Sequence, residues 1–181
     1  MSLTETWLNE HRNAELSIEG YTIFRSDRDR TRKRGRGRGS GGVATYIRND
    51  IASSFKTILQ YSNGVNEILV TYSESEALLI VTIYRQPDDT IHGHPSTHKQ
   101  FDEILQKLRE VFDSIHGKQP VILMCGDFNL PHYNWHDNLL KNGATCDEKN
   151  MLHTLFKLTN DYQLLQCISE PTHRAGNTLD F

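Results

Sequence analysis

Residues 120–129 read Pro-Val-Ile-Leu-Met-Cys-Gly-Asp-Phe-Asn, an apolar run that ends in a glycine and two polar residues flanking a phenylalanine. An unbroken run of this length predicts a strand that is covered on both faces. The strand would present Asp127 at its C-terminal end, and if it continued, Asn129 would point to the same face. These side chains could position a water molecule and a phosphate oxygen. Asp and Asn are also common in turns after strands, and the motif alone favours a turn.

The chain before this strand contains two predicted β-hairpins. Residues 21–24 and 43–47 are short runs of β-branched and aromatic residues that could pair as antiparallel strands. Residues 68–72 and 77–84 form the clearer hairpin, because only the polar link 73–76 separates them.

Two helices are predicted from the spacing of apolar residues. From Phe101 to Ile115 these residues recur every three or four positions, which predicts a helix with one buried face that Gly117 ends. A second helix is predicted over residues 149–158, followed by a short strand at 164–168 and the start of another at 178–181. Hairpins followed by helices between later strands favour an α+β fold, a two-sheet β-sandwich flanked by helices.

Length and composition indicate a single domain over residues 1–181. The hydrophobic content is 36%, and no run of about 18 apolar residues would cross a membrane. The N-terminus lacks the features of a secretory signal, so we expect an intracellular protein. Cys125, Cys146 and Cys167 are odd in number and widely separated, which indicates buried reduced thiols rather than disulfides or a zinc site.

An Arg/Gly-rich loop is predicted at residues 28–42, although the net charge of the chain is −3. Basic side chains on such a loop could bind DNA phosphates without a fixed geometry. The loop could equally be a nuclear-localisation patch or a solvated insertion. The candidate DNA-binding residues are Arg32, Lys33, Arg34, Arg36 and Arg38. The histidines His92, His94 and His98 fit a polar loop better than a metal site.

Several other polar residues stand beside apolar runs. Glu5 precedes Trp7 and could offer a hard metal ligand, but a glutamate at a helix start explains it as well. Tyr84 ends an apolar run, so its hydroxyl could emerge at a sheet edge or belong to an ordinary core tyrosine. Thr172 and Asp180 lie in a turn-rich segment and are, taken singly, structural.

The order of the motifs carries more information than any one of them. Together they resemble the endonuclease/exonuclease/phosphatase superfamily, which has a DNase I-like fold, and in particular the endonuclease domain of LINE-type non-LTR retrotransposons. The resemblance covers nearly the whole chain. The motifs are Glu5-Thr6-Trp7, Gly41-Gly42-Val43-Ala44, Tyr84-Arg85-Gln86-Pro87, Gly126-Asp127-Phe128-Asn129, Pro171-Thr172-His173 and Asn177-Thr178-Leu179-Asp180.

The resemblance implies a role for each of these positions. Glu5 would hold Mg²⁺, with Mn²⁺ as a substitute, while Tyr84 and Asn129 would contact the scissile phosphate and Asp127 would orient the attacking water. Thr172 and Asp180 would support the site. The implied reaction is nicking of DNA to leave a 3′ hydroxyl, with a reverse transcriptase domain in cis. No small-molecule cofactor and no membrane partner are implied, and a functional protein would work in the nucleus.

The chain also departs from the family pattern. Only Met1 to Thr4 precede Glu5, and the family's closing Ser-Asp-His motif does not occur before Phe181. We therefore expect the sandwich to lack its first strand and its last strand or strands, and the chain on its own to be inactive or nearly so. The alternative function is a non-catalytic remnant that binds nucleic acid or metal. Relatives of this fold also cleave inositol phosphates, lipids or RNA, so DNA is an inference by analogy.

Overall fold

Two β-sheets and two long helices make up the protein. The computed structural model describes residues 1–8, 17–28, 41–87, 97–116, 119–135, 137, 139–168, 170–172 and 178. The first sheet has the antiparallel order β1-β3-β2, built from β1 (Ser2–Thr4), β2 (Tyr21–Ser26) and β3 (Val43–Arg48). The second sheet has the order β4-β5-β6-β7, built from β4 (Lys56–Ser62), β5 (Asn66–Ser73), β6 (Leu78–Arg85) and β7 (Val121–Asp127). A short helix, α1 (Asn49–Ala52), leads from β3 towards β4.

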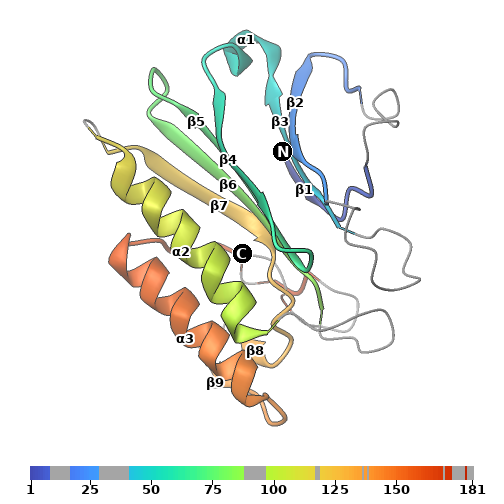
Figure 1. Cartoon of the computed structure of the whole chain (residues 1–181), viewed down its shortest axis with the longest axis vertical. Helices are drawn as coiled ribbons and strands as arrows, with labels where there is room; N and C mark the ends of the chain where they lie inside the picture. Colours follow the sequence, from blue (N-terminus) through green and yellow to red (C-terminus); the bar gives the residue numbers. More distant parts are fainter. Residues whose placement is uncertain are drawn as a thin grey trace.

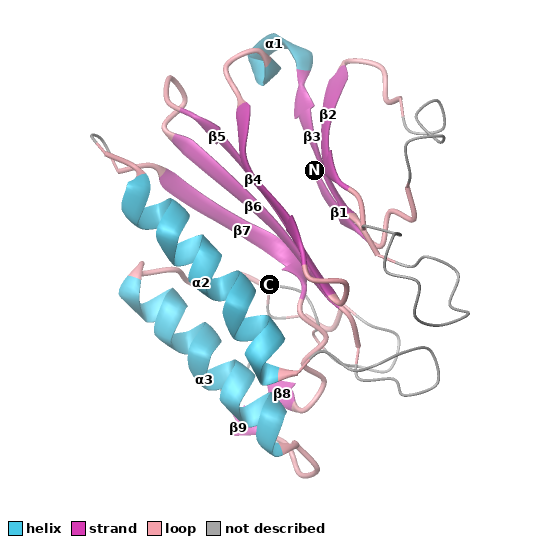
Figure 2. Cartoon of the chain, viewed as in Figure 1, coloured by secondary structure: helices cyan, strands magenta, loops and turns pink. Residues whose placement is uncertain are grey.

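The helices α2 (His98–Ser114) and α3 (Cys146–Asp161) cover one face of the four-stranded sheet. Figure 1 shows them side by side on this face, with the three-stranded sheet on the opposite face. A small hairpin of β8 (Tyr133–Asn134) and β9 (Leu139–Leu140) precedes α3. The layers are therefore sheet, sheet and helices, as the colouring in Figure 2 makes clear. No helix in the described part of the chain is long and apolar enough to cross a membrane.

The central strand β6 explains why the layers stay together. Leu79, Val81 and Ile83 are buried in the large core against the helices. The alternate residues Ile80 and Tyr84 belong to two smaller clusters with the three-stranded sheet. Because side chains alternate along a strand, a continuous apolar run can bury both faces at once.

Most of the predicted elements are confirmed. The hairpins β2–β3 and β5–β6 are antiparallel, and the two predicted helices are α2 and α3. The α+β fold with two main sheets and helices is confirmed as well. The expectation that no strand precedes Glu5 is wrong, because the three residues ahead of it form the short strand β1, which pairs with β3. Helix α2 begins earlier than its apolar spacing indicates, since Thr97 and Gln100 form a capping box.

The prediction that the strand at 120–125 is covered on both faces is wrong. Val121 and Leu123 are 70% and 50% exposed. Among the described strands β7 lies at the edge of its sheet, and β1, which contacts β7, has only three residues. The three-stranded sheet therefore ends too soon to cover the start of β7. A continuous apolar run shows that a strand can be buried, but the neighbouring layer decides whether it is.

The predicted strand at residues 164–168 is also wrong. These residues follow α3 without regular structure, and Leu165 is 83% exposed. Cys167 in this segment and Cys146 at the start of α3 are exposed, so the prediction that the three thiols are buried is wrong. The predicted strand at 178–181 lies outside the described residues except for Thr178, whose hydroxyl donates to the carbonyl oxygen of Glu170 at 3.0 Å. Gly117, His92 and His94 lie outside them too, whereas His98 is at the start of α2 and its Nε2 is 3.2 Å from Thr154 Oγ1.

Tyr162, just after α3, joins the two helices. Its hydroxyl donates to Asp113 Oδ1 at 2.6 Å, and its ring packs edge-on against Phe112. Burial, followed by the hydrogen bond to Asp113 and the charge of that carboxylate, raises the pKa of Tyr162 to about 12. Folding therefore favours the neutral hydroxyl.

This shift predicts how stability depends on alkaline pH. In the unfolded chain a tyrosine loses its proton near pH 10, whereas Tyr162 in the folded chain keeps it to about pH 12. The unfolded state thus binds fewer protons between these values, and the free energy of unfolding falls as the pH rises. We expect Tyr162→Phe to make this fall shallower in urea titrations from pH 8 to 11. Parallel curves for the two proteins would contradict the prediction.

Candidate active site

The candidate site lies where β1, β6 and β7 end. Strands β6 and β7 are parallel, and Tyr84 is the partner of Asp127 in their register. Paired residues of parallel strands point to the same face, so both side chains face the three-stranded sheet. Glu5 directly follows β1, the short strand of that sheet. Three residues far apart in the sequence are thus brought to one end of the sandwich.

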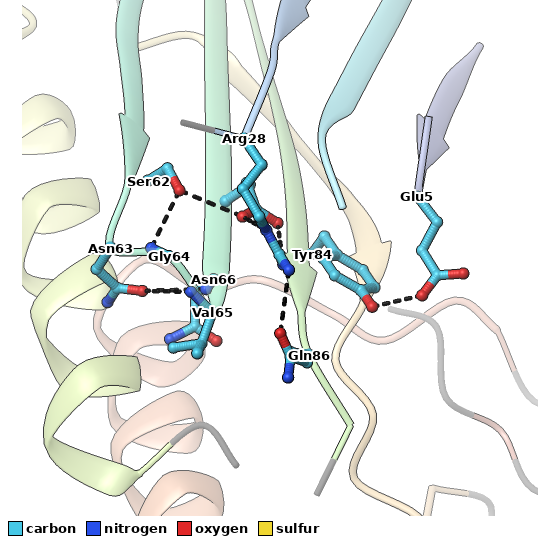
Figure 3. A network of polar contacts seen from close by, with 10 residues as sticks. Glu5, Arg28, Ser62, Asn63, Gly64, Val65, Asn66, Tyr84 and Gln86 are labelled. Carbon is cyan, nitrogen blue, oxygen red and sulfur yellow. Dashed lines mark hydrogen bonds and ion pairs between the residues drawn. The ribbon is translucent and has the colours of Figure 1, made fainter. Parts of the chain in front are cut away.

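Glu5 and Tyr84 are in direct contact across the two sheets. The Tyr84 hydroxyl donates a hydrogen bond to Glu5 Oε1, as Figure 3 shows. The Tyr84 side chain is buried, while Glu5 is exposed. Burial, followed by the hydrogen bond to Glu5 and its charge, raises the pKa of Tyr84 far above its ordinary value, and the carboxylate of Asp127 adds to the rise. Tyr84 is therefore a neutral hydroxyl donor beside two carboxylates.

Strand β1 is fixed in place by its neighbours on both sheets. The N-terminal amine of Met1 donates to the carbonyl oxygen of Tyr46 at 2.9 Å. The hydroxyl of Thr82 donates to Ser2 Oγ at 3.1 Å and lies 2.7 Å from the hydroxyl of Thr45. These hydroxyl groups therefore connect β1 to β3 and β6.

The segment after β1 has an unusual backbone. Glu5 and Trp7 have φ values of +51° and +56°, a region that residues other than glycine rarely adopt. The segment is held by Gly42 and Gly41, whose carbonyl oxygens accept from Thr6 N at 3.2 Å and Trp7 N at 3.0 Å. A Cβ atom at Gly42 would lie 2.7 Å from Thr6 Oγ1, which explains the second glycine of the Gly41-Gly42 motif. Strain of this kind concentrates at functional sites.

After β7 the chain turns at once. Asn129 has a φ of +47°, and its backbone N–H donates to Asp127 Oδ1 at 3.0 Å. The strand therefore does not continue, and Asp127 and Asn129 do not share a strand face as the sequence analysis considered. Asn129 Nδ2 donates instead to the carbonyl oxygen of Arg85 at 2.7 Å. The turn orients one oxygen of the Asp127 carboxylate.

Arg85 stabilises this turn through hydrogen bonds to its backbone. Its side chain is fully buried, and Nη1 donates to the carbonyl oxygen of Asn129 at 2.6 Å and to that of Phe128 at 3.4 Å. Arg85 and Asn129 thus bind each other's backbone. The sequence analysis assigned no role to Arg85, although a charged residue that continues a buried apolar strand is a signal of such a contact.

Gly126 is required by the close approach of β7 to β6. A Cβ atom at this position would lie 2.0 Å from the carbonyl oxygen of Ile83. Backbone cannot move aside as a flexible side chain can. The glycine that precedes Asp127 is therefore fixed by packing and sets the distance between the two strand ends.

We expect Gly126→Ala to destabilise the fold by about 3 kcal/mol or more, because the added methyl group must push β6 and β7 apart. The melting temperature would fall by roughly 6–12 °C. Gly20→Ala is the matched control, since Gly20 also has a positive φ, of +82°, but open space around its Cβ position. Its cost should be about 1 kcal/mol. Equal losses of melting temperature in both variants would contradict the packing argument.

The donor chemistry of the site suits a hard cation. Mg²⁺ is usually held by one or two carboxylates together with water and substrate phosphate, and Glu5 and Asp127 supply two carboxylates beside Tyr84. In the part of the chain that the structure describes, no group of three or more His, Cys, Asp or Glu residues could enclose a metal ion. An open site of this type fits Mg²⁺ or Mn²⁺ rather than a structural zinc ion.

The remaining predicted site residues are Thr172, Asp180 and the basic residues of the loop. Thr172 is described and exposed, and its supporting role stays a prediction. Asp180 and the loop residues Arg32, Lys33, Arg34, Arg36 and Arg38 lie outside the described residues. Of the predicted loop 28–42, the structure describes Arg28, Gly41 and Gly42.

Comparison with known proteins shows the family of the chain. The model of the endonuclease/exonuclease/phosphatase family matches residues 1–180, so the chain belongs to this family. No protein with a curated description matches it.

Several solved structures are similar at low identity. The endonuclease domain of TRAS1, a telomere-specific non-LTR retrotransposon, is 16% identical over 90% of this chain and 66% of its own, with a TM-score of 0.44. The human Nocturnin catalytic domain with bound sulfate is 16% identical over 89% and 59%, with a TM-score of 0.48. TDP2 of D. rerio, complexed with a single-strand DNA product, is 12% identical over 71% and 46%, with a TM-score of 0.37. This chain spans two thirds or less of each.

Proposed function

We propose that this protein hydrolyses phosphodiester bonds in DNA with the help of a divalent metal ion. It would act as the endonuclease domain of a non-LTR retrotransposon polyprotein that nicks target DNA. The observation that carries the proposal is the meeting of Glu5, Tyr84 and Asp127 at three strand ends, in a chain of the endonuclease/exonuclease/phosphatase family.

Each residue of the site has a distinct proposed role. Glu5 would hold the metal ion, which supplies charge neutralisation at the phosphate. Tyr84 is kept neutral by burial and by Glu5; its O–H donates to Glu5 in this structure and would turn to a phosphate oxygen when Glu5 holds the metal ion. Asp127 would orient the attacking water, since its Oδ1 is already fixed by the backbone of Asn129. The Asn129 amide donates one N–H to the carbonyl oxygen of Arg85 and would offer its second to the phosphate.

The choice of DNA rests on the retrotransposon-like motifs and on the basic composition of residues 28–42. A loop with several arginines binds a phosphate backbone without regard to sequence. In the complete gene product, a reverse transcriptase domain in cis would use the 3′ hydroxyl of the nick as its primer. Such a protein would act in the nucleus. A remnant that binds metal or nucleic acid without cutting it is the second candidate, because the carboxylates Glu5 and Asp127 could hold a metal ion without hydrolysis.

Metal binding tests the site without requiring turnover. We expect Mn²⁺ to bind the protein, as measured by the loss of the free Mn²⁺ signal in electron paramagnetic resonance. Glu5→Gln should weaken the affinity about tenfold or more, because a carboxylate ligand becomes a weaker neutral one. Glu19→Gln is the control, since Glu19 is exposed just before β2. Equal Mn²⁺ affinity in the wild type and Glu5→Gln would exclude Glu5 as a ligand.

Nicking of supercoiled plasmid in Mg²⁺ separates the enzyme from the remnant. The hydrolase proposal predicts nicked circles. The rate should fall about a hundredfold or more with Asp127→Ala, since the residue that orients the attacking water is lost. Metal and DNA binding without any nicking would support the remnant instead. Nicking that survives Asp127→Ala would mean that the reaction occurs elsewhere.

A further inference from the structure

An ion pair with one fully buried and one largely buried side chain lies beside the candidate site. Arg28, two residues after β2, donates from Nε to Glu67 Oε1 and from Nη2 to Glu67 Oε2 at 2.9 Å. The side chains of Arg28 and Glu67 are 13% and 0% exposed. The two parallel contacts use the fork geometry that distinguishes arginine from lysine.

The remaining contacts of this pair come from other strands. Arg28 Nη1 donates to Gln86 Oε1 at 3.0 Å, and Ser62 Oγ donates to Glu67 Oε1 at 3.2 Å. Ser62 ends β4, Glu67 belongs to β5 and Gln86 directly follows β6. The guanidinium group is therefore tied to β5 and to the residue after β6, and Ser62 of β4 holds its partner Glu67, which leaves the guanidinium group little freedom to rotate (Figure 3).

This fixed group lies over the ring of Tyr84. Arg28 Cζ is 5.6 Å from the ring centroid, within the range of a cation–π contact. The other end of Tyr84 is held by Glu5, which accepts from its hydroxyl. Gln86 lies two residues beyond Tyr84, so Arg28 contacts both the ring and the chain that follows it. Tyr84 is therefore held at its ring by Arg28 and at its hydroxyl by Glu5.

Stability alone does not account for this arrangement. Buried ion pairs are seldom more stabilising than apolar side chains of the same volume, because both charges lose their hydration. The charge of Arg28 is also offset by Glu67, so its contribution to phosphate attraction is reduced. What the pair supplies is a flat, immobile surface against one face of Tyr84.

We propose that Arg28 is a positioning residue for Tyr84, which it holds in the orientation that presents the hydroxyl beside Glu5 and Asp127. The effect of Arg28 on catalysis rests on the proposed function, in which the Tyr84 hydroxyl contacts the scissile phosphate. The three hydrogen bonds that the structure describes for the Arg28 side chain are all made to Glu67 and Gln86. We therefore assign Arg28 an effect through Tyr84 rather than a direct contact with substrate.

The orientation of Tyr84 can be measured without activity. In protein labelled with 3-fluorotyrosine, the Tyr84 signal among the seven tyrosines is assigned from its loss in Tyr84→Phe. We expect Arg28→Lys, which keeps the charge but loses the fork, to shift or broaden that ¹⁹F resonance. Gln86→Leu removes one contact of the guanidinium and should produce a smaller shift if Arg28→Lys fails to fold. Arg25→Lys is the control, because Arg25 pairs with Asp27 near the surface. An unchanged Tyr84 resonance in Arg28→Lys and Gln86→Leu would overturn the proposal.

The plasmid assay then tests the consequence for catalysis. Arg28→Lys should lower kcat for nicking about tenfold to a hundredfold, as expected for a displaced contact group, while KM changes less than about twofold. Arg25→Lys should change neither constant. A shifted Tyr84 resonance with an unchanged kcat would overturn the positioning role. Absence of nicking in the wild type would count against the proposed function alone, since the resonance of Tyr84 still decides whether Arg28 orients it.

Discussion

The parallel pairing of β6 with β7 is the constraint on which the site depends. It is the one parallel pairing among the described strands, and it carries Tyr84 and Asp127 to the same edge of the sheet. Such a pairing needs a crossover connection, and α2 lies between the two strands in the chain and covers the sheet. The close approach of Gly126 to Ile83 then fixes the separation of the two strand ends. Tyr84 and Asp127 are neighbours because the strand register pairs them and the close approach at Gly126 fixes the separation of the two backbones.

The two ends of the sandwich differ in what they bury. Along β6, Ile80 and Val81 pack in apolar clusters, whereas Arg85 at the strand end is a fully buried charge. Three of the five non-glycine residues with positive φ in the described chain, Glu5, Trp7 and Asn129, also lie at this end. Buried charges and left-handed backbone lower stability, so their concentration around Tyr84 indicates an end of the fold shaped by function rather than by packing.

The sequence predicted elements well where a periodic pattern was enough, as in α2 and the hairpin of β5 and β6. It failed where a distant layer decides the outcome, because the apolar runs of β6 and β7 look alike and only β6 is covered on both faces. The contact of Glu5 with Tyr84 was reachable only through the ordered motifs, since 79 positions separate them. The pair of Arg28 with Glu67, 39 positions apart, has no local signal at all. Arg28 belonged to a basic run that predicted solvent or phosphate contacts, yet it is buried against a carboxylate.

The same contacts also bear on the basic loop. Residue 28 is held beside Tyr84 by its side chain, and residues 41 and 42 are held beside Glu5 by hydrogen bonds to Trp7 and Thr6. The two described ends of residues 28–42 therefore lie beside Tyr84 and Glu5, which contact each other. A segment tethered at two points has a high effective concentration near its anchors, so basic residues between these ends suit a phosphate at the proposed site. The two described ends of the loop thus lie at the candidate site. This position links the basic charge of residues 28–42 to the proposed nucleic-acid substrate.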